Sequence, residues 1–352
     1  MAQPALTDAK PRRAELATQL KRISDRAAES AGGFEDRYFR LAGFSLRLRF
    51  AGSLAGPMTL ALAHLETDPI TDPDLTVRLW DSRSTASPPP RPPWGGDAYL
   101  EHGVIKDYFA PGFYTLFPPG TGILNVLDDE RREGFFWIDD AERLGLWEIG
   151  APLRTMIHLW LGGRGHQLVH AAAVGRPDGC VLIVGGSGAG KSSSSLVCLW
   201  SSLQLLGEDY CVVSPGSPHE VSSLYCTAKV GPEALARLPQ LRELVHSPPT
   251  PDSEKALLDV NAALPEKLLG EAPLRAIAIP KIVPNEDSAV RPASSGAALA
   301  AVAPSTLLQL PGNGDRAMSI LRDLVTAVPC HSLEVGSDPA KVPSAIESLL
   351  DR

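Results

Sequence analysis

The chain has 352 residues, of which 44% are hydrophobic and 21% charged, and its formal net charge is −8. This composition is typical of a globular protein, and the length allows two domains or one large one. The acidic balance argues against non-specific binding to nucleic acid. No apolar run approaches the ~18 residues of a membrane span, and the N-terminal stretch lacks the apolar core of a secretory signal. We therefore expect a cytoplasmic, enzyme-like protein that associates with neither nucleic acid nor membrane.

The first 150 residues predict a small α+β domain that is rich in antiparallel sheet. Residues 11–30 favour a helix, with Pro11 at its start and Leu16, Leu20 and Ile23 on one side. Alternating or aromatic-rich runs predict strands, at residues 44–50, 75–80, 113–117 and 135–138. We expect this domain to bind the acceptor, as a peptide along an unpaired sheet edge, or to serve oligomerisation.

Residues 151–352 predict a second, α/β domain with a mostly parallel or mixed central sheet. Helices are expected at residues 152–161, 193–200 and 343–350. Strands are expected at residues 170–174, 180–184, 211–213 and 276–283. A turn at residues 176–179 would join two of these strands into a hairpin. The sequence contains five cysteines, at positions 180, 198, 211, 226 and 330, in no zinc or redox spacing. We expect them to be reduced thiols in the core.

The octapeptide GGSGAGKS at residues 185–192 fits the phosphate-binding pattern G-x-x-x-x-G-K-[ST]. An apolar strand precedes it and a helix is expected after it, which is the context the pattern requires. Glycines let the backbone N–H groups surround an anion, the lysine reaches the β- and γ-phosphates, and the last serine is an oxygen ligand for Mg²⁺. The sequence thus predicts a site for ATP and Mg²⁺, made by Gly185, Gly186, Ser187, Gly188, Ala189, Gly190, Lys191, Ser192 and Ser193.

An acidic pair, Glu208 and Asp209, follows the loop. If the strands around it run parallel, the pair lies at the same sheet edge as the loop. Carboxylates there can hold Mg²⁺ together with Ser192, or accept a proton from an attacking hydroxyl. The alternative is a solvated pair in a turn. We interpret Asp209 as the base and Glu208 as its assistant in metal binding or positioning.

His170 precedes the loop, and the expected hairpin would bring it near the γ-phosphate. It would contact the phosphates or orient an acid. A core or edge histidine is the alternative, and His166 is a competing candidate. Four downstream cations could also clamp the phosphoryl group: Lys229, Arg275, Lys281 and Arg291. Each has a solvated surface residue as its alternative, and we favour Lys229.

Together, His170, the loop and the Glu208-Asp209 pair resemble the catalytic domain of HPr kinase/phosphorylase over residues 165–215. The resemblance implies a P-loop serine kinase, with the acidic pair as general base and metal contact. Where that family has two aspartates, this chain has Glu208 in the first position. The family's downstream glycine-rich signature is absent, and VSSLYCTAKVG stands in that region instead.

The segments LVHAAAV and LGEDYCVVS look more similar to the HPr-kinase-like proteins of bacterial peptide-modification clusters, especially those of lasso peptides. That branch implies phosphorylation of a serine in a precursor peptide. HPr kinases are hexameric, so the resemblance also raises a homo-oligomer as an expectation. Two other functions fit the core motif: a small-molecule kinase of adenylylsulfate type, and a nucleotide-dependent binding protein without transfer activity.

Overall fold

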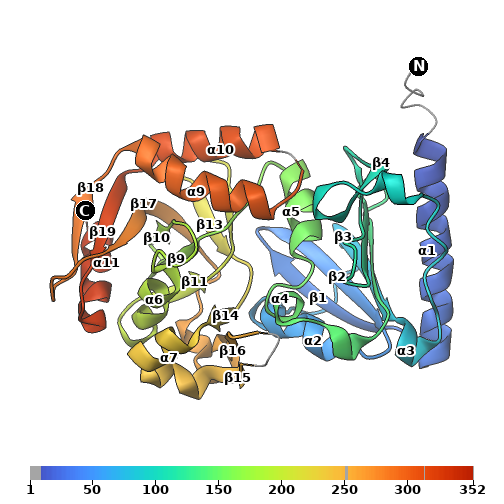
Figure 1. Cartoon of the computed structure of the whole chain (residues 1–352), viewed down its shortest axis with the longest axis horizontal. Helices are drawn as coiled ribbons and strands as arrows, with labels where there is room; N and C mark the ends of the chain where they lie inside the picture. The colour runs from blue at the N-terminus through green and yellow to red at the C-terminus, as the bar shows by residue number, and fades with distance from the viewer. Residues whose placement is uncertain (1–8, 250–252, 313, 352) are drawn as a thin grey trace. The chain divides into compact units, whose positions relative to one another are not determined.

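The computed structural model describes residues 9–249, 253–312 and 314–351, and the chain divides into two compact units (Figure 1). The N-terminal unit comprises Met1–Thr59, Glu66–Ile149 and Leu153–Gly163. The C-terminal unit comprises Leu60–Leu65, Gly150–Pro152 and Arg164–Arg352. Leu60–Leu65 thus belongs to the C-terminal unit although the chain on both sides of it belongs to the N-terminal unit, and we call it the exchanged segment. The sequence suggested one boundary after residue 150. No helix in the described ranges is long and apolar enough to cross a membrane.

A seven-stranded mixed sheet forms the N-terminal unit, in the order β1-β2-β3-β7-β6-β5-β4. Its strands are β1 (Glu35–Leu41), β2 (Phe44–Ala51), β3 (Leu75–Asp81), β4 (Val104–Ala110), β5 (Phe113–Leu116), β6 (Ile123–Asp128) and β7 (Glu133–Ile138). β3 pairs in parallel with β2 and β7, and the other neighbours are antiparallel. The edge strands are β1 and β4, and peptide binding along such an edge stays a prediction.

The helix α1 (Ala9–Ala31) covers one face of this sheet. Leu16, Leu20 and Ile23 are buried on its inner side, as their spacing predicts, against Trp80 and Phe135 of the strands. The remaining helices of this unit are short: α2 (Ala55–Thr59), α3 (Ser82–Thr85), α4 (Leu146–Gly150, whose last residue belongs to the C-terminal unit) and α5 (Arg154–Gly163).

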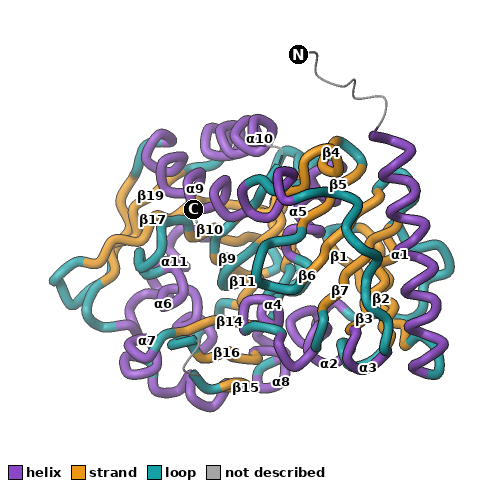
Figure 2. The backbone as a smooth tube through the Cα atoms, turned by 45° about the vertical axis from the view of Figure 1, so that its right-hand side comes forward, coloured by secondary structure: helices purple, strands orange, loops and turns teal. Residues whose placement is uncertain are grey.

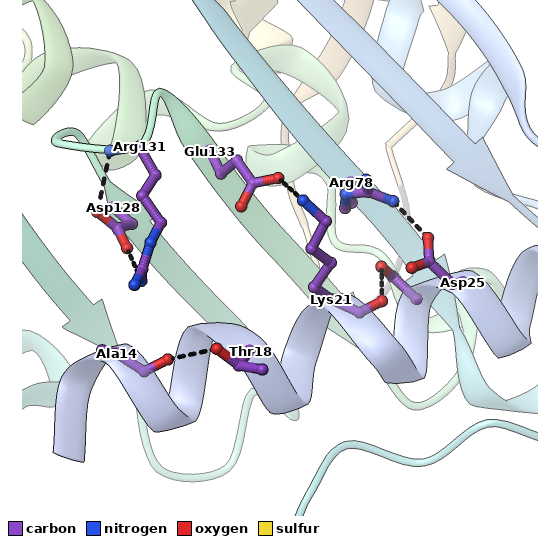
Figure 3. Close-up of polar contacts among 9 residues, drawn as sticks. Ala14, Thr18, Lys21, Asp25, Arg78, Asp128, Arg131 and Glu133 are labelled. Carbon is purple, nitrogen blue, oxygen red and sulfur yellow. Dashed lines mark hydrogen bonds and ion pairs between the residues drawn. The ribbon is translucent and has the colours of Figure 1, made fainter. Parts of the chain in front are cut away.

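Ion pairs run along the line where α1 meets the sheet (Figure 3). The Lys21 ammonium lies 2.7 Å from Glu133 of β7, and the Arg78 guanidinium of β3 lies 2.7 Å from Asp25. Such partly exposed pairs contribute about 0–1 kcal/mol each. Most of the stabilisation of α1 therefore comes from its buried apolar side.

A nine-stranded mixed sheet is the centre of the C-terminal unit. The strands β11-β9-β10-β17-β13-β12-β8 follow one another across it, β19 also pairs with β17, and β18 pairs with β19. Their bounds are β8 (Gln167–Val169), β9 (Ala172–Arg176), β10 (Gly179–Ile183), β11 (Gln204–Gly207), β12 (Cys211–Ser214), β13 (Glu220–Ser223), β17 (Glu271–Ile282), β18 (Ala289–Pro292) and β19 (Cys330–Val335). This is the expected α/β architecture.

Both faces of the nine-stranded sheet are buried, because its strands alternate between two apolar cores. In β10, Val181 and Ile183 join one core, while Cys180 and Leu182 join the other. α6 (Lys191–Leu196) and α11 (Val342–Leu350) pack on the first face, and α9 (Ser295–Gln309) and α10 (Gly314–Ala327) on the second (Figures 1 and 2). The five cysteines are all free and buried, as the sequence predicted.

A second, three-stranded sheet was not anticipated from the sequence. It consists of β14 (Thr227–Val230), β16 (Ala256–Asp259) and β15 (Val245–Ser247), in that order. The helices α7 (Pro232–Arg237) and α8 (Val260–Ala263) adjoin it. We call the three strands β14, β16 and β15 the small sheet. The Cys226 N–H just before β14 donates to the Ala61 carbonyl, so the exchanged segment Leu60–Leu65 anchors it within the C-terminal unit.

His64 in the exchanged segment should make stability depend on pH. Its Nε2 lies 2.6 Å from the Ser223 hydroxyl, and burial lowers its pKa from 6.5 to about 4. The unfolded chain therefore binds the proton more readily, and folding loses stability as pH falls from 6.5 to 4. The loss amounts to at most about 3 kcal/mol.

Denaturant unfolding of the wild type and His64→Gln between pH 7 and 4 would measure this loss. The variant should show a shallower fall in the free energy of unfolding over that window. His246→Gln is the matched control, because His246 is exposed on β15. Equal slopes for the wild type and His64→Gln would contradict the assignment.

Candidate functional site

The glycine-rich loop joins β10 to α6, so a buried strand leads in and a helix leads out. β9 and β10 form the expected antiparallel hairpin, and β10 also pairs in parallel with β17. The Lys191 side chain is buried and folds back over the loop. Its Nζ donates to the carbonyl oxygens of Gly185 and Gly186 at 2.8 and 3.2 Å. The loop therefore closes around one ammonium group.

Two glycines are required by the conformation of this loop. Gly188 and Gly190 have φ of +78° and +98°, in the left-handed region that strains other residues. Gly190 is also the residue before the first turn of α6, whose leading N–H groups have no partner within the helix. Among the described residues, no hydrogen bond uses the N–H groups of Ser187 or Gly188. Donors for an anion are thus concentrated at this loop.

The acidic pair lies in the bend between β11 and β12, next to the loop. Asp209 is held by two partners: its Oδ1 lies 2.9 Å from Nε2 of His170, and its Oδ2 lies 2.8 Å from Nζ of Lys229. The Glu208 carboxylate has different partners. Its carboxylate accepts from the Lys229 backbone N–H at 3.2 Å and from the Ser192 hydroxyl. The pair thus connects the loop, the histidine and β14.

The two acids differ in their electrostatics. Burial alone would raise the pKa of Asp209, but the hydrogen bond from His170 and the charge of Lys229 outweigh it and hold that pKa well below its usual range. Burial, reinforced by the neighbouring Asp209 charge, raises the pKa of Glu208. Asp209 is therefore the firmly ionised member of the pair. Its side chain is 19% exposed, whereas the whole Glu208 residue is only 4% exposed.

His170 lies in the bend between β8 and β9. The strand that the sequence predicted at residues 170–174 begins at Ala172 in the structure, so His170 lies two residues before it. Its backbone N–H donates to the Thr306 hydroxyl, and its ring lies 5.3 Å from the Tyr210 ring between centroids. Its Nδ1 is buried without a partner among the described residues. His166, the competing candidate, instead has its Nδ1 3.3 Å from the Arg164 carbonyl.

A cavity of about 380 Å³ opens beside the loop. The loop residues from Gly186 to Ser193, Ala189 excepted, form one side of it. Charged groups also line it: Lys229 of β14, Lys255 immediately before β16, and Glu233 and Arg237 of α7. Ile282 at the end of β17 and Val335 at the end of β19 add an apolar wall. The volume lies in the range of small-ligand sites.

Of the four downstream cations that the sequence suggested, only Lys229 lines this cavity. Arg275 donates to the Asp178 carbonyl in the β9–β10 turn, and Arg291 pairs with Glu334. Lys281 is exposed and does not line the cavity. Lys255 and Arg237 escaped sequence reasoning, because no motif or periodicity singles them out.

No family model matches the chain, and no curated protein matches it either. Among solved structures, the chain is similar to the Hpr(Ser) kinase/phosphatase from Coxiella burnetii, with a TM-score of 0.27 and 14% sequence identity. That likeness covers 53% of this chain and 94% of the Coxiella chain.

Proposed function

We propose that this protein is an ATP-dependent kinase that transfers a phosphoryl group to the hydroxyl of a serine in a peptide or protein. One observation carries the proposal: Asp209, held by His170 and Lys229, lies beside a glycine-rich loop whose Ser192 contacts Glu208. Phosphoryl transfer needs an anion-binding loop, oxygen ligands for a metal and a carboxylate for the acceptor proton. These residues supply all three requirements.

ATP and Mg²⁺ fit the residues present. The loop offers unpaired N–H donors and the Lys191 ammonium, and the cavity beside it has a volume in the range of small-ligand sites. Ser192, Glu208 and Asp209 would hold Mg²⁺, with phosphate oxygens completing its shell. Within the described ranges, no group of three or more His, Cys, Asp or Glu side chains could hold a metal. When bound, the nucleotide supplies the phosphoryl group and the metal offsets its negative charge.

The two acids would divide the work. Asp209 would accept the proton of the acceptor hydroxyl at its carboxylate, because it is ionised and the more exposed of the two. His170 would orient that carboxylate through Nε2. Glu208 would support the metal side of the site through its contact with Ser192. Lys229 would balance the negative charge of the pair.

The proposed identity of the acceptor follows from the sequence resemblance. The similarity of LVHAAAV and LGEDYCVVS to kinases of lasso-peptide clusters favours a precursor-peptide serine. We propose that class, in a cytoplasmic protein, with a small hydroxyl metabolite as the second candidate because the core motif suits both.

Incubation with γ-labelled ATP, Mg²⁺ and candidate acceptors tests the proposal. Label should enter a serine-containing precursor peptide, and it should not enter the same peptide with that serine replaced by alanine. Label in a small hydroxyl compound would favour the metabolite kinase instead. Nucleotide binding with no transfer to any acceptor would support the binding-protein alternative and overturn the kinase.

A further inference from the structure

A second lysine, Lys255, lies next to the small sheet and lines the cavity beside the glycine-rich loop. β14 and β16 are antiparallel, with Lys229 opposite Leu257. Lys255 lies in the bend immediately before β16, which begins at Ala256. Both lysines line the cavity beside the glycine-rich loop, although they are 26 residues apart in the sequence (255 − 229).

Lys255 and Lys191 line the same cavity. Lys191 lies at the start of α6, next to the loop, and Lys255 lies immediately before β16. The charge of Lys255 adds to burial in lowering the pKa of Lys191. The charges of Asp209 and Glu208 act in the opposite direction and raise that pKa. Two ammonium groups that line one cavity repel each other, and an anion bound there would be attracted by both.

We propose that Lys255 is a second phosphate-binding lysine, which contacts the terminal phosphate of the nucleotide and so distinguishes a triphosphate from a diphosphate. The proposal rests on the nucleotide binding proposed above. In loops of this pattern the lysine reaches the β- and γ-phosphates, and a second lysine that lines the same cavity can reach the same end of the ligand. The apolar side chains of Ile282 and Val335, which also line the cavity, remain for the nucleoside.

If a lysine contacts only the γ-phosphate, its removal should weaken the binding of ATP and leave the binding of ADP nearly unaltered. The dissociation constants of ATP and ADP, each measured with Mg²⁺ by titration calorimetry, give a readout independent of turnover. Lys255→Ala should weaken ATP binding by about tenfold or more, because a charge-assisted hydrogen bond is lost, and ADP binding by less than about threefold. Lys255→Arg should retain part of the preference for ATP.

Lys281→Ala is the matched control, since it removes the same charge from an exposed lysine outside the cavity. It should leave both dissociation constants unchanged. Thermal unfolding of each variant would show that the fold is intact. An equal loss of ATP and ADP affinity in Lys255→Ala, or no loss of either, would overturn the role of Lys255. If the wild type itself binds neither nucleotide, the proposed function fails rather than this inference alone.

Discussion

Replacing Asp209 with asparagine is expected to lower kcat by about 100- to 10,000-fold, the range that a general base supplies. Asparagine keeps the size of the side chain and can accept the hydrogen bond from His170, but it cannot take a proton from the acceptor. The affinity for ATP should change much less, because the substitution leaves intact the loop N–H groups and the Lys191 ammonium that would contact the phosphates, and Ser192 and Glu208 as proposed metal ligands. Steady-state kinetics with the labelled acceptor, together with nucleotide titration, would separate the two effects.

The substitution also removes the charge that balances the buried Lys229, so stability must be followed in parallel. Asp178→Asn is the matched control: Asp178 lies in the β9–β10 turn with 78% of its side chain exposed. It should retain full activity. Should Asp209→Asn keep near-normal kcat while Glu208→Gln loses it, the roles of the two acids are reversed. Full activity in both variants would exclude either carboxylate as the base.

Lys191→Ala is expected to weaken ATP binding by about 10- to 100-fold, and turnover should fall at least as far. A lysine–phosphate contact is a charged hydrogen bond that contributes about 1.5–3 kcal/mol. The truncation also leaves the carbonyls of Gly185 and Gly186 without the ammonium that organises the loop. Titration calorimetry with ATP would measure the loss.

Lys281→Ala serves as control here too, because it makes the same substitution away from the cavity. Lys191→Arg should recover little, since the wider guanidinium must fit inside a loop that closes around one ammonium. Unchanged ATP affinity in Lys191→Ala would remove the glycine-rich loop from nucleotide binding. The kinase proposal would then fail as well, because it requires ATP to bind at this loop.

Short-range patterns predicted many of the elements correctly. The alternation in residues 44–50 predicted β2, and the spacing of Leu16, Leu20 and Ile23 predicted the buried side of α1. These signals are strong because apolar residues on one side of each element are buried, while most polar residues on the other side are half-buried in β2 and exposed or half-buried in α1. The nine-stranded sheet was harder to predict. β9 and β10 are buried on both faces, so their sequences show apolar runs without alternation.

The helices α9 and α10 were missed for different reasons. α9 is rich in alanine and apolar residues around its whole circumference and contains Pro304, so no clear stripe marks its buried side. α10 does have a buried stripe at helical spacing, formed by Ala317, Leu321, Leu324 and Val325, so its sequence contained a signal that was overlooked. The small sheet was missed because its strands are short and separated by helical turns, and β15 and β16 flank the Pro-rich stretch at 247–251. Pairing of such strands is decided by the rest of the unit.

The glycine-rich loop and the acidic pair are the part of the site that the sequence determined by itself. A strand, a tight turn and a helix start are contiguous in the chain, so their residue types and order carry the information. Only the tertiary structure decided which side chains meet that loop. Lys229 lies in a separate sheet and Lys255 lies next to it, and His170 meets Asp209 because β8, β9, β11 and β12 belong to one larger sheet. Contacts between residues distant in sequence depend on sheet pairing and register, and no local pattern records them.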